Sequence, residues 1–271
     1  MRVERITRPA WADALGRDRF GLWTEIVVEP EGGGDSVTQR LRWIPPCRFL
    51  MGSPEDEPLR NDNEGPQHAV TLSRGYWLFD TACTQALWQA VMGENPSRLT
   101  GDDRRPVDSV SWNDVQGFLT RLNAGRPGLE LSLPTEAQWE HACRAGTTTP
   151  FSFGVAITPE QVNYNGHYPY TDDAKGLFRK ETVPVASLPP NAWGLYEMHG
   201  NVWEWCADGQ RDYSAEAETD PRGPESVGAK RVLRGGSWKD RARIARAACR
   251  YWNLPVDRFG NFGFRCVRVQ A

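Results

Sequence analysis

The stretch GLYEMHGNVWEWCAD, residues 194–208, carries acidic and turn-forming residues suited to a chemical site. Two tryptophans flank Glu204, Glu197 lies just upstream, and a Gly-Asn turn separates the two carboxylates. Carboxylates together with carbonyls exposed by an irregular turn are the ligands that a hard cation such as Ca²⁺ takes. A structural role is the other interpretation, in which Glu204, costly to bury unpaired, caps a loop by accepting backbone N–H bonds. The residues alone favour the structural role.

Common catalytic signatures are absent from the sequence. It contains no GxSxG elbow, no P-loop, no GxGxxG and no HExxH motif. The four histidines, at 68, 141, 167 and 199, are far apart. His141 and Cys143 stand two residues apart on an expected helix, so they point to different faces, and we expect no zinc site on them.

Composition and charge exclude several classes of partner. The net charge is −3 and the pI about 5.9, so no basic excess exists to neutralise a nucleic-acid backbone. No window reaches the apolar length of a membrane span, and residues 1–20 lack the apolar core of a signal peptide. We therefore expect a cytoplasmic protein with no nucleic-acid partner and no membrane span.

The chain is rich in residues that form turns and in tryptophan. Its 26 Gly and 20 Pro indicate many turns, and its 12 Trp are an expected source of buried area. The six cysteines, at 47, 83, 143, 206, 249 and 266, form no CxxC pair. We expect buried free thiols, and an oxidised pair stays open as an alternative.

Local patterns predict short strands and three helices. TEIVV and TQRLRWI, on either side of EGGGD, predict a β-hairpin, and HAVTL and GYWLF predict further strands. A helix is expected from Thr84 to Gly93, and capping boxes at Ser111 and Thr135 predict two more, the last ending at Gly146. We expect an extension with the hairpin at residues 1–42 and one compact domain at 43–271.

A series of motifs resembles the formylglycine-generating-enzyme, or sulfatase-modifying factor, domain family. In order they are MGS…EGPQHAV, TQALWQAVMGENPS, PVDSVSW, LPTEAQWEHACRAGT, VNYN, NAWGLYEMHGNVWEWCAD, RVLRGGSW and GFRCVR. The match runs from about residue 43 to 268. The resemblance implies an α+β, C-type-lectin-like fold with little regular secondary structure, small antiparallel sheets and about three helices.

The resemblance also implies bound Ca²⁺ as a structural cofactor. Carried over by motif position, the ligands are the side chains of Glu197 and Glu204 and the carbonyls of Gly200 and Val202. A second family site uses the asparagine-rich stretch near VNYN, residues 162–165, but the loop that follows differs from the family in length and spacing.

The family's oxidase chemistry is not expected in this chain. The resemblance implies copper held by two cysteines, three and eight residues past the serine of GGS, and thiolate is the ligand that Cu(I) selects. Those positions hold Asp240 and Ala245, and Cys249 is displaced. An iron-dependent branch uses a histidine triad with an added N-terminal domain, and residues 1–40 contain no histidine. We therefore expect no copper, no catalytic residues and no enzymatic activity.

The C-terminal stretch GGSWKDRARIARAACRYWNLPVDRFGNFGFR keeps the family frame at both ends, with chemically mixed residues between. This pattern resembles the variable proteins of diversity-generating retroelements, in which an error-prone reverse transcriptase rewrites template adenines. The resemblance implies a variable region at about residues 237–263 on an exposed binding face. The alternative is ordinary drift of a non-catalytic paralogue, with the aromatic residues buried.

Between the frame residues lie the candidate ligand-binding residues: Lys239, Asp240, Arg241, Ile244, Cys249, Tyr251, Trp252, Asn253, Leu254, Val256, Phe259, Gly260 and Phe262. Most of the large ones are reachable from an Asn codon by changing its adenines, whereas Lys239 and Trp252 are not. Tyr, Trp, Phe and Arg are also enriched at binding hot spots. Trp238, Arg243 and Phe264 belong to the frame, and we expect them buried.

The sequence therefore predicts a non-catalytic protein that binds a ligand through a diversified C-terminal surface. The expected partner is an unidentified protein or other macromolecular ligand. The alternatives are a metal-dependent oxidoreductase of the parent family and a regulatory module that acts beside a signalling protein.

Overall fold

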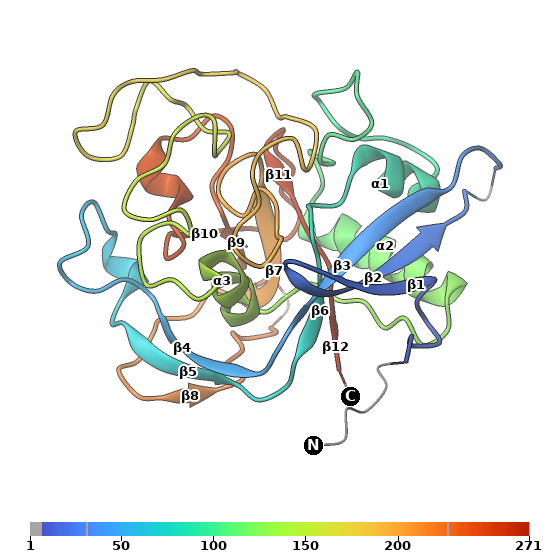
Figure 1. Ribbon diagram of the computed structural model, residues 1–271, viewed down its shortest axis with the longest axis horizontal. Coiled ribbons are helices and arrows are strands. Elements are labelled where there is room, and N and C mark those ends of the chain that lie inside the picture. The colour runs from blue at the N-terminus through green and yellow to red at the C-terminus, as the bar shows by residue number, and fades with distance from the viewer. Residues whose placement is uncertain (1–6, 31, 227, 271) are drawn as a thin grey trace.

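Three small sheets and three α-helices make up the computed structural model, which describes residues 7–30, 32–226 and 228–270. Within these residues no helix is both long and apolar enough to cross a membrane. Figure 1 shows α1 and α2 beside the sheet that contains β2 and β3, with β4, β5 and β8 on the other side of the molecule. Long irregular segments join these elements, as the many Gly and Pro residues predict.

The largest sheet joins the first strands of the chain to the last one. Its order is β1 (Ala14–Asp18), β2 (Gly21–Val28), β3 (Val37–Ile44), β6 (Tyr76–Phe79) and β12 (Val267–Val269), and all its pairs are antiparallel. The predicted hairpin is β2–β3. The expected boundary between residues 42 and 43 falls inside β3, and β3 pairs with β6, so the hairpin shares one sheet with the rest of the protein.

Two smaller sheets complete the β-structure. One has the order β10 (Arg250–Asn253), β9 (Arg231–Arg234), β7 (Trp203–Gly209) and β11 (Phe262–Gly263). The other has the order β4 (Cys47–Met51), β5 (His68–Leu72) and β8 (Glu218–Thr219). Their pairs are antiparallel except for β7–β11 and β5–β8, which are parallel. The prediction of small antiparallel sheets is confirmed apart from these two parallel pairs.

The three helices begin at the predicted caps. They are α1 (Gln85–Met92), α2 (Trp112–Gly125) and α3 (Glu136–Arg144). The side chains of Thr84, Ser111 and Thr135 each accept a hydrogen bond from a backbone N–H of the first turn, which satisfies a donor that the helix cannot use. Helix α3 ends at Arg144, and its C-cap is Ala145, in the left-handed conformation, one residue before the expected Gly146. Two 3₁₀ turns, Asp62–Glu64 and Ala242–Ala245, complete the helical structure of the described residues.

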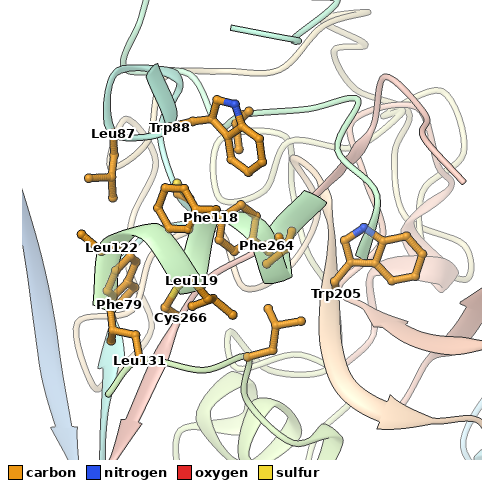
Figure 2. Close-up of a cluster of buried hydrophobic side chains, with 14 of the residues drawn as sticks. Phe79, Leu87, Trp88, Phe118, Leu119, Leu122, Leu131, Trp205, Phe264 and Cys266 are labelled. Atoms are coloured by element: carbon orange, nitrogen blue, oxygen red, sulfur yellow. The ribbon is translucent and has the colours of Figure 1, made fainter. Parts of the chain in front are cut away.

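Aromatic rings fill the main core, as the tryptophan content predicts. Trp88 of α1 stacks on Phe118 of α2 with 5.3 Å between ring centroids, and Phe264 meets both rings edge-on. Figure 2 shows these three side chains together in the interior. Phe264 is fully buried, so the expectation for this frame residue is confirmed.

Buried arginines hold the C-terminal third of the chain against earlier elements. Arg246 pairs with both Glu57 and Glu64, each with a shortest N–O distance of 2.6 Å. Arg234 of β9 pairs with Glu136 and Glu140 of α3, Arg250 of β10 with Glu136, and Arg265 with Glu204. Burial opposes ionisation of Glu64, but the hydrogen bonds and charge of Arg246 outweigh it and hold the pKa of Glu64 below its usual value.

Replacing Arg246 by Met should destabilise the protein by about 3–5 kcal/mol, because Glu57 and Glu64 would remain buried without a counter-charge. Urea unfolding at pH 7 measures this change. Arg258→Met is the matched control: Arg258 also pairs with a carboxylate, Asp114, but its side chain is 62% exposed. That variant should lose no more than about 1 kcal/mol. Equal losses in the two variants would contradict the assigned role of Arg246.

Candidate functional site

An exposed apolar patch lies at β10 and in the loop that follows it. Tyr251, Leu254, Val256 and Phe259 are 44%, 44%, 63% and 47% exposed. We call these four residues the C-terminal patch. Tyr251 and Phe259 both pack on the buried ring of Phe262, with centroid distances of 6.4 and 5.0 Å. The buried ring of Phe262 therefore supports the patch from the interior, although the patch side chains face water.

Backbone contacts to the start of α2 hold the loop of the patch in place. The N–H of Ser109 donates to the carbonyl of Phe259 at 3.0 Å, and the N–H of Asn113 donates to the carbonyl of Pro255 at 3.1 Å. Arg258 adds two hydrogen bonds to the carboxylate of Asp114. These bonds use main-chain atoms or the side chain of Arg258, which is not a patch residue, so they do not depend on which side chains form the patch.

Two predicted binding residues are in the interior, and their assignment to the surface is wrong. Phe262 is 3% exposed because β11 pairs with β7, which turns its ring against Trp205 at 5.4 Å. Cys249 is 1% exposed, and its Sγ lies 3.9 Å from Nδ2 of Asn61. Neither side chain can contact a ligand on the surface.

The other predicted binding residues are at least partly accessible. Lys239 and Arg241 are exposed, and partial burial is found for Asp240, Ile244, Trp252, Asn253 and Gly260. Asp240 is held by Ser237, whose hydroxyl donates to its Oδ2 at 2.5 Å. Burial raises the pKa of Asp240 despite this bond.

The expectation that Trp238 and Arg243 are buried is wrong, since each is partly exposed. Trp238 stacks near Phe178, and its Nε1 donates to the carbonyl of Gly260. The carbonyl of Arg243 accepts from Nε of Arg246 at 2.8 Å, so its backbone serves the buried network while its side chain faces outward.

Arg241 and Arg243 line a cleft of about 570 Å³. The guanidinium of Arg241 lies 4.6 Å above the ring of Tyr168, and Leu59 and Asp173 also line the cleft. Tyr168 and Leu59 are about half exposed. Sequence reasoning did not name these two residues, because they come from irregular loops far from the variable region and carry no periodic signal.

In the candidate calcium loop, the carboxylate of Glu204 is already paired. Arg265 donates two hydrogen bonds to it, at 2.7 and 2.8 Å, and Nε1 of Trp139 donates a third at 2.7 Å. This is the structural role that the residues alone favour. Oε2 accepts two of these bonds and Oε1 accepts one, so only Oε1 of Glu204 retains a lone pair for a cation.

Glu197 is more suited to a cation than Glu204. It is buried, and its oxygens accept from the N–H groups of Ala186 and Leu188, while the described residues show no ion pair to it. Burial raises the pKa of Glu197 to about 7. Glu197, Gly200 and Asn201 all have positive φ, so the backbone curls tightly between the two carboxylates.

The described residues fit a metal only in part. Among residues 7–30, 32–226 and 228–270, no group of three or more His, Cys, Asp or Glu side chains is arranged to hold an ion. A site here would thus need backbone carbonyls, as at Gly200 and Val202. At the second family position, Nδ2 of Asn163 donates to Oδ1 of Asn201, and Oδ1 of Asn163 is buried without a hydrogen-bond partner.

The positions of the family's copper ligands offer no thiolate pair. Asp240 is engaged with Ser237, and Ala245 is fully buried. The nearby thiol, Cys249, has its pKa raised to about 12 by burial, with the charge of Glu64 acting in the same direction. A single thiol that resists ionisation is a poor ligand for Cu(I).

Comparison with known proteins assigns the family. Residues 33–270 match the sulfatase-modifying factor enzyme 1-like domain, and the chain belongs to this family. The formylglycine-generating enzyme of Bos taurus is 38% identical over 295 residues, which cover 87% of this chain and 76% of that relative. The inactive C-alpha-formylglycine-generating enzyme 2 of Bos taurus is 37% identical over 91% of both chains. Overall identity therefore does not separate active from inactive relatives.

Two solved structures share the C-type-lectin-like fold over most of the chain. Treponema denticola variable protein 1 has a TM-score of 0.74 and 26% identity, and covers 90% of this chain and 98% of its own. PvdO from Pseudomonas aeruginosa has a TM-score of 0.73 and 27% identity with the same coverage. The fold predicted from the motifs is confirmed.

Side chains of the C-terminal patch should be replaceable at little cost in stability. Tyr251→Ser, Leu254→Ser and Phe259→Ser should each change the free energy of unfolding by no more than about 1 kcal/mol, because these side chains are nearly half exposed. Phe262→Ala should lose about 3–5 kcal/mol through lost burial and a cavity. Thermal melts of the four variants measure the difference. If the serine variants melt as early as Phe262→Ala, the patch is part of the core.

Proposed function

We propose that this protein is a non-catalytic member of its family that binds a protein or other macromolecular ligand through the C-terminal patch, with Arg241 and its cleft as a second contact region. One observation supports the proposal most directly. In the C-terminal segment Arg246 and Arg250 are buried and paired with glutamates, whereas the side chains of Tyr251, Leu254, Val256 and Phe259 face water. An apolar patch of this kind is unfavourable in water unless a partner covers it. Aromatic side chains that pack on a buried ring, as Tyr251 and Phe259 do on Phe262, favour binding because they lose little conformational freedom when a partner covers them.

The same contrast between buried, paired residues and exposed side chains supports a proposal that this surface is diversified. The loop is anchored through backbone atoms, which leaves its side chains free to change. Arg241, Tyr251, Leu254, Val256 and Phe259 are all exposed and are all reachable from an Asn codon by changing adenines. The likeness to Treponema denticola variable protein 1 supports this interpretation. The DNA that flanks the gene tests it: we expect a second, near-identical copy of the codons for residues 237–263, with adenines at these positions, and a reverse transcriptase gene. Flanking DNA with neither feature would leave a binding surface without the retroelement.

The absence of oxidase activity is directly testable. Incubated with Cu(I), oxygen and a cysteine-containing peptide, the protein should yield no formylglycine, because Asp240 and Ala245 stand where the family's thiolates are implied. The related formylglycine-generating enzyme of Streptomyces coelicolor, 40% identical over 192 residues, is the positive control. Peptide oxidation, or stoichiometric Cu(I) binding that vanishes in Cys249→Ala, would instead support an oxidoreductase with altered metal ligation.

We further propose that Ca²⁺ binds beside Glu197 as a structural ion, with the carbonyls of Gly200 and Val202 and the side chain of Glu204 as the other protein ligands. The support is the buried, unpaired carboxylate of Glu197 within a tightly curled backbone. A divalent cation would offset the cost of ionising this buried group, and oxygen ligands of this kind are those that Ca²⁺ takes.

Calcium should raise the melting temperature most at alkaline pH. Without metal, the raised pKa of Glu197 means that the folded state binds its proton more tightly than the unfolded state. Stability should then fall between about pH 4.5 and 7, by up to about 3 kcal/mol from this group, and Ca²⁺ at pH 8 should restore it. Glu197→Gln should remove the calcium response. Asp208→Asn is the matched control, because burial also raises the pKa of Asp208, to about 6. An identical melting temperature with excess chelator and with Ca²⁺ would exclude the site.

A further inference from the structure

A cysteine, a histidine and a tyrosine from three separate elements form a hydrogen-bonded chain away from the C-terminal patch. Sγ of Cys47, on the edge strand β4, lies 2.8 Å from Nε2 of His141 on α3. Nδ1 of the same imidazole lies 3.2 Å from the hydroxyl of Tyr76 on β6. The Tyr76 hydroxyl is also 2.9 Å from the carbonyl oxygen of Gln138.

These contacts determine which nitrogen of His141 carries the proton. The carbonyl of Gln138 can only accept, so Tyr76 donates its single proton there. The Tyr76 oxygen must then accept from His141, which places the imidazole proton on Nδ1. Nε2 is left with its lone pair directed at Cys47, so the thiol donates to it. A nucleophile, a base and a third group that orients the base are therefore in place.

The chain of hydrogen bonds ends at an apolar cleft. The cleft has a volume of about 570 Å³, and its lining includes Cys47, Phe49, Leu50 and Trp193. Trp193 and Phe49 pack on the imidazole of His141, with centroid distances of 4.8 and 5.1 Å. Cys47 is partly exposed, whereas the other five cysteines are buried. An apolar molecule in this cleft therefore has access to a single thiol.

We propose that Cys47 is a thiol–disulfide exchange site, assisted by His141, for a disulfide with an apolar substituent. This site is independent of the proposed binding function, since none of its residues belongs to the C-terminal patch. Thiol–disulfide exchange places the developing negative charge on sulfur atoms. It therefore needs a proton acceptor for the thiol and a cavity that holds the substituent of the disulfide. Acyl transfer from a thioester would in addition need donors for an oxyanion.

The exchange balances without any further reactant. Sγ of Cys47 attacks one sulfur of R–S–S–R′, its proton moves to Nε2 of His141, and the Cys47–S–S–R bond forms as the S–S bond breaks. The departing R′S⁻ takes the proton from Nε2 and leaves as R′SH. Cys47 is oxidised to the mixed disulfide, the R′S sulfur of the attacked disulfide is reduced to R′SH, and His141 returns to its starting state.

The resting state is a neutral pair, which gives the site a distinctive pH dependence. Burial raises the pKa of Cys47 to about 11 and lowers the pKa of His141 to about 4. The other titratable or charged groups around the imidazole are Tyr76, whose pKa is raised by burial, and Arg144, which is paired with Glu140. Arg48 lines the outer part of the cleft. At pH 7 only roughly one Cys47 thiol in ten thousand would be ionised on its own, so in the proposed reaction the proton passes to Nε2 of His141 as the new S–S bond forms, without a preformed thiolate.

The test follows release of pyridine-2-thione from hexyl 2-pyridyl disulfide and from methyl 2-pyridyl disulfide between pH 5 and 9. With the wild-type protein we expect one equivalent of product, a rate that varies less than about tenfold over this range, and faster reaction with the hexyl probe. Cys47→Ser should release none. His141→Gln should react about 10²-fold more slowly at pH 6, with a rate that rises about tenfold per pH unit because only the free thiolate reacts.

Two further variants separate chemistry from structure. Tyr76→Phe removes the group that orients His141 and should slow exchange severalfold while the rate stays nearly independent of pH. Leu50→Ser should weaken the preference for the hexyl probe, because Leu50 lines the cleft that would hold the hexyl chain. A variant that fails to fold reveals itself by releasing up to six equivalents, one for each cysteine. The decision then rests on the wild-type profile and on Tyr76→Phe.

The proposal is overturned by any of three results. The first is a wild-type rate that itself rises about tenfold per pH unit, because this would mean that only the thiolate reacts. The second is unchanged release of product from Cys47→Ser. The third is faster modification of Cys47 by a hexanoyl thioester than by the hexyl disulfide, because this would assign the cleft to acyl transfer.

Discussion

Buried ion pairs between arginine and glutamate hold the C-terminal third of this chain against earlier segments. Arg234 and Arg250 both reach Glu136 on α3, and Arg246 reaches back to Glu57 and Glu64. Each pair joins segments that are far apart in sequence and lies where water cannot replace a lost partner. A guanidinium in this position accepts few alternative arrangements, because a carboxylate left alone in the interior is strongly unfavourable. We interpret these pairs as the contacts that fix where the C-terminal segment lies.

This constraint divides the C-terminal segment into two kinds of residue. Arg246 and Arg250 point inward, and the neighbouring Tyr251 points outward from the same strand that carries Arg250. Side chains alternate between the two faces of a strand, so of two adjacent positions one faces the interior and the other faces water. The interior keeps its charges while the exterior carries aromatic and aliphatic groups. Under the proposed binding function, recognition and folding would therefore depend on different side chains of one short stretch.

Local features of this protein are readable from its sequence, and non-local ones are not. The caps at Thr84, Ser111 and Thr135 predict their helices because each involves residues only three positions apart. Phe259 and Phe262 are chemically identical neighbours, yet one is exposed and the other is buried by the parallel pairing of β11 with β7. The sequence of the C-terminal segment contains no local pattern that predicts the pairing of β11 with β7. The contact between Cys47 and His141 is hidden in the same way, since 94 residues separate them.

The path of the loop between β10 and β11 limits how this surface can change. These strands are the two edges of one four-stranded sheet, so residues 254–261 pass from one edge to the other. On the way the backbone is fastened to Ser109 and Asn113 at fixed points. Adding or removing one residue would shift every later position by about 3.3 Å and would separate these bonds from their partners. The geometry therefore constrains the length of this loop, and relatives that share these anchors should differ here by substitution rather than by insertion or deletion.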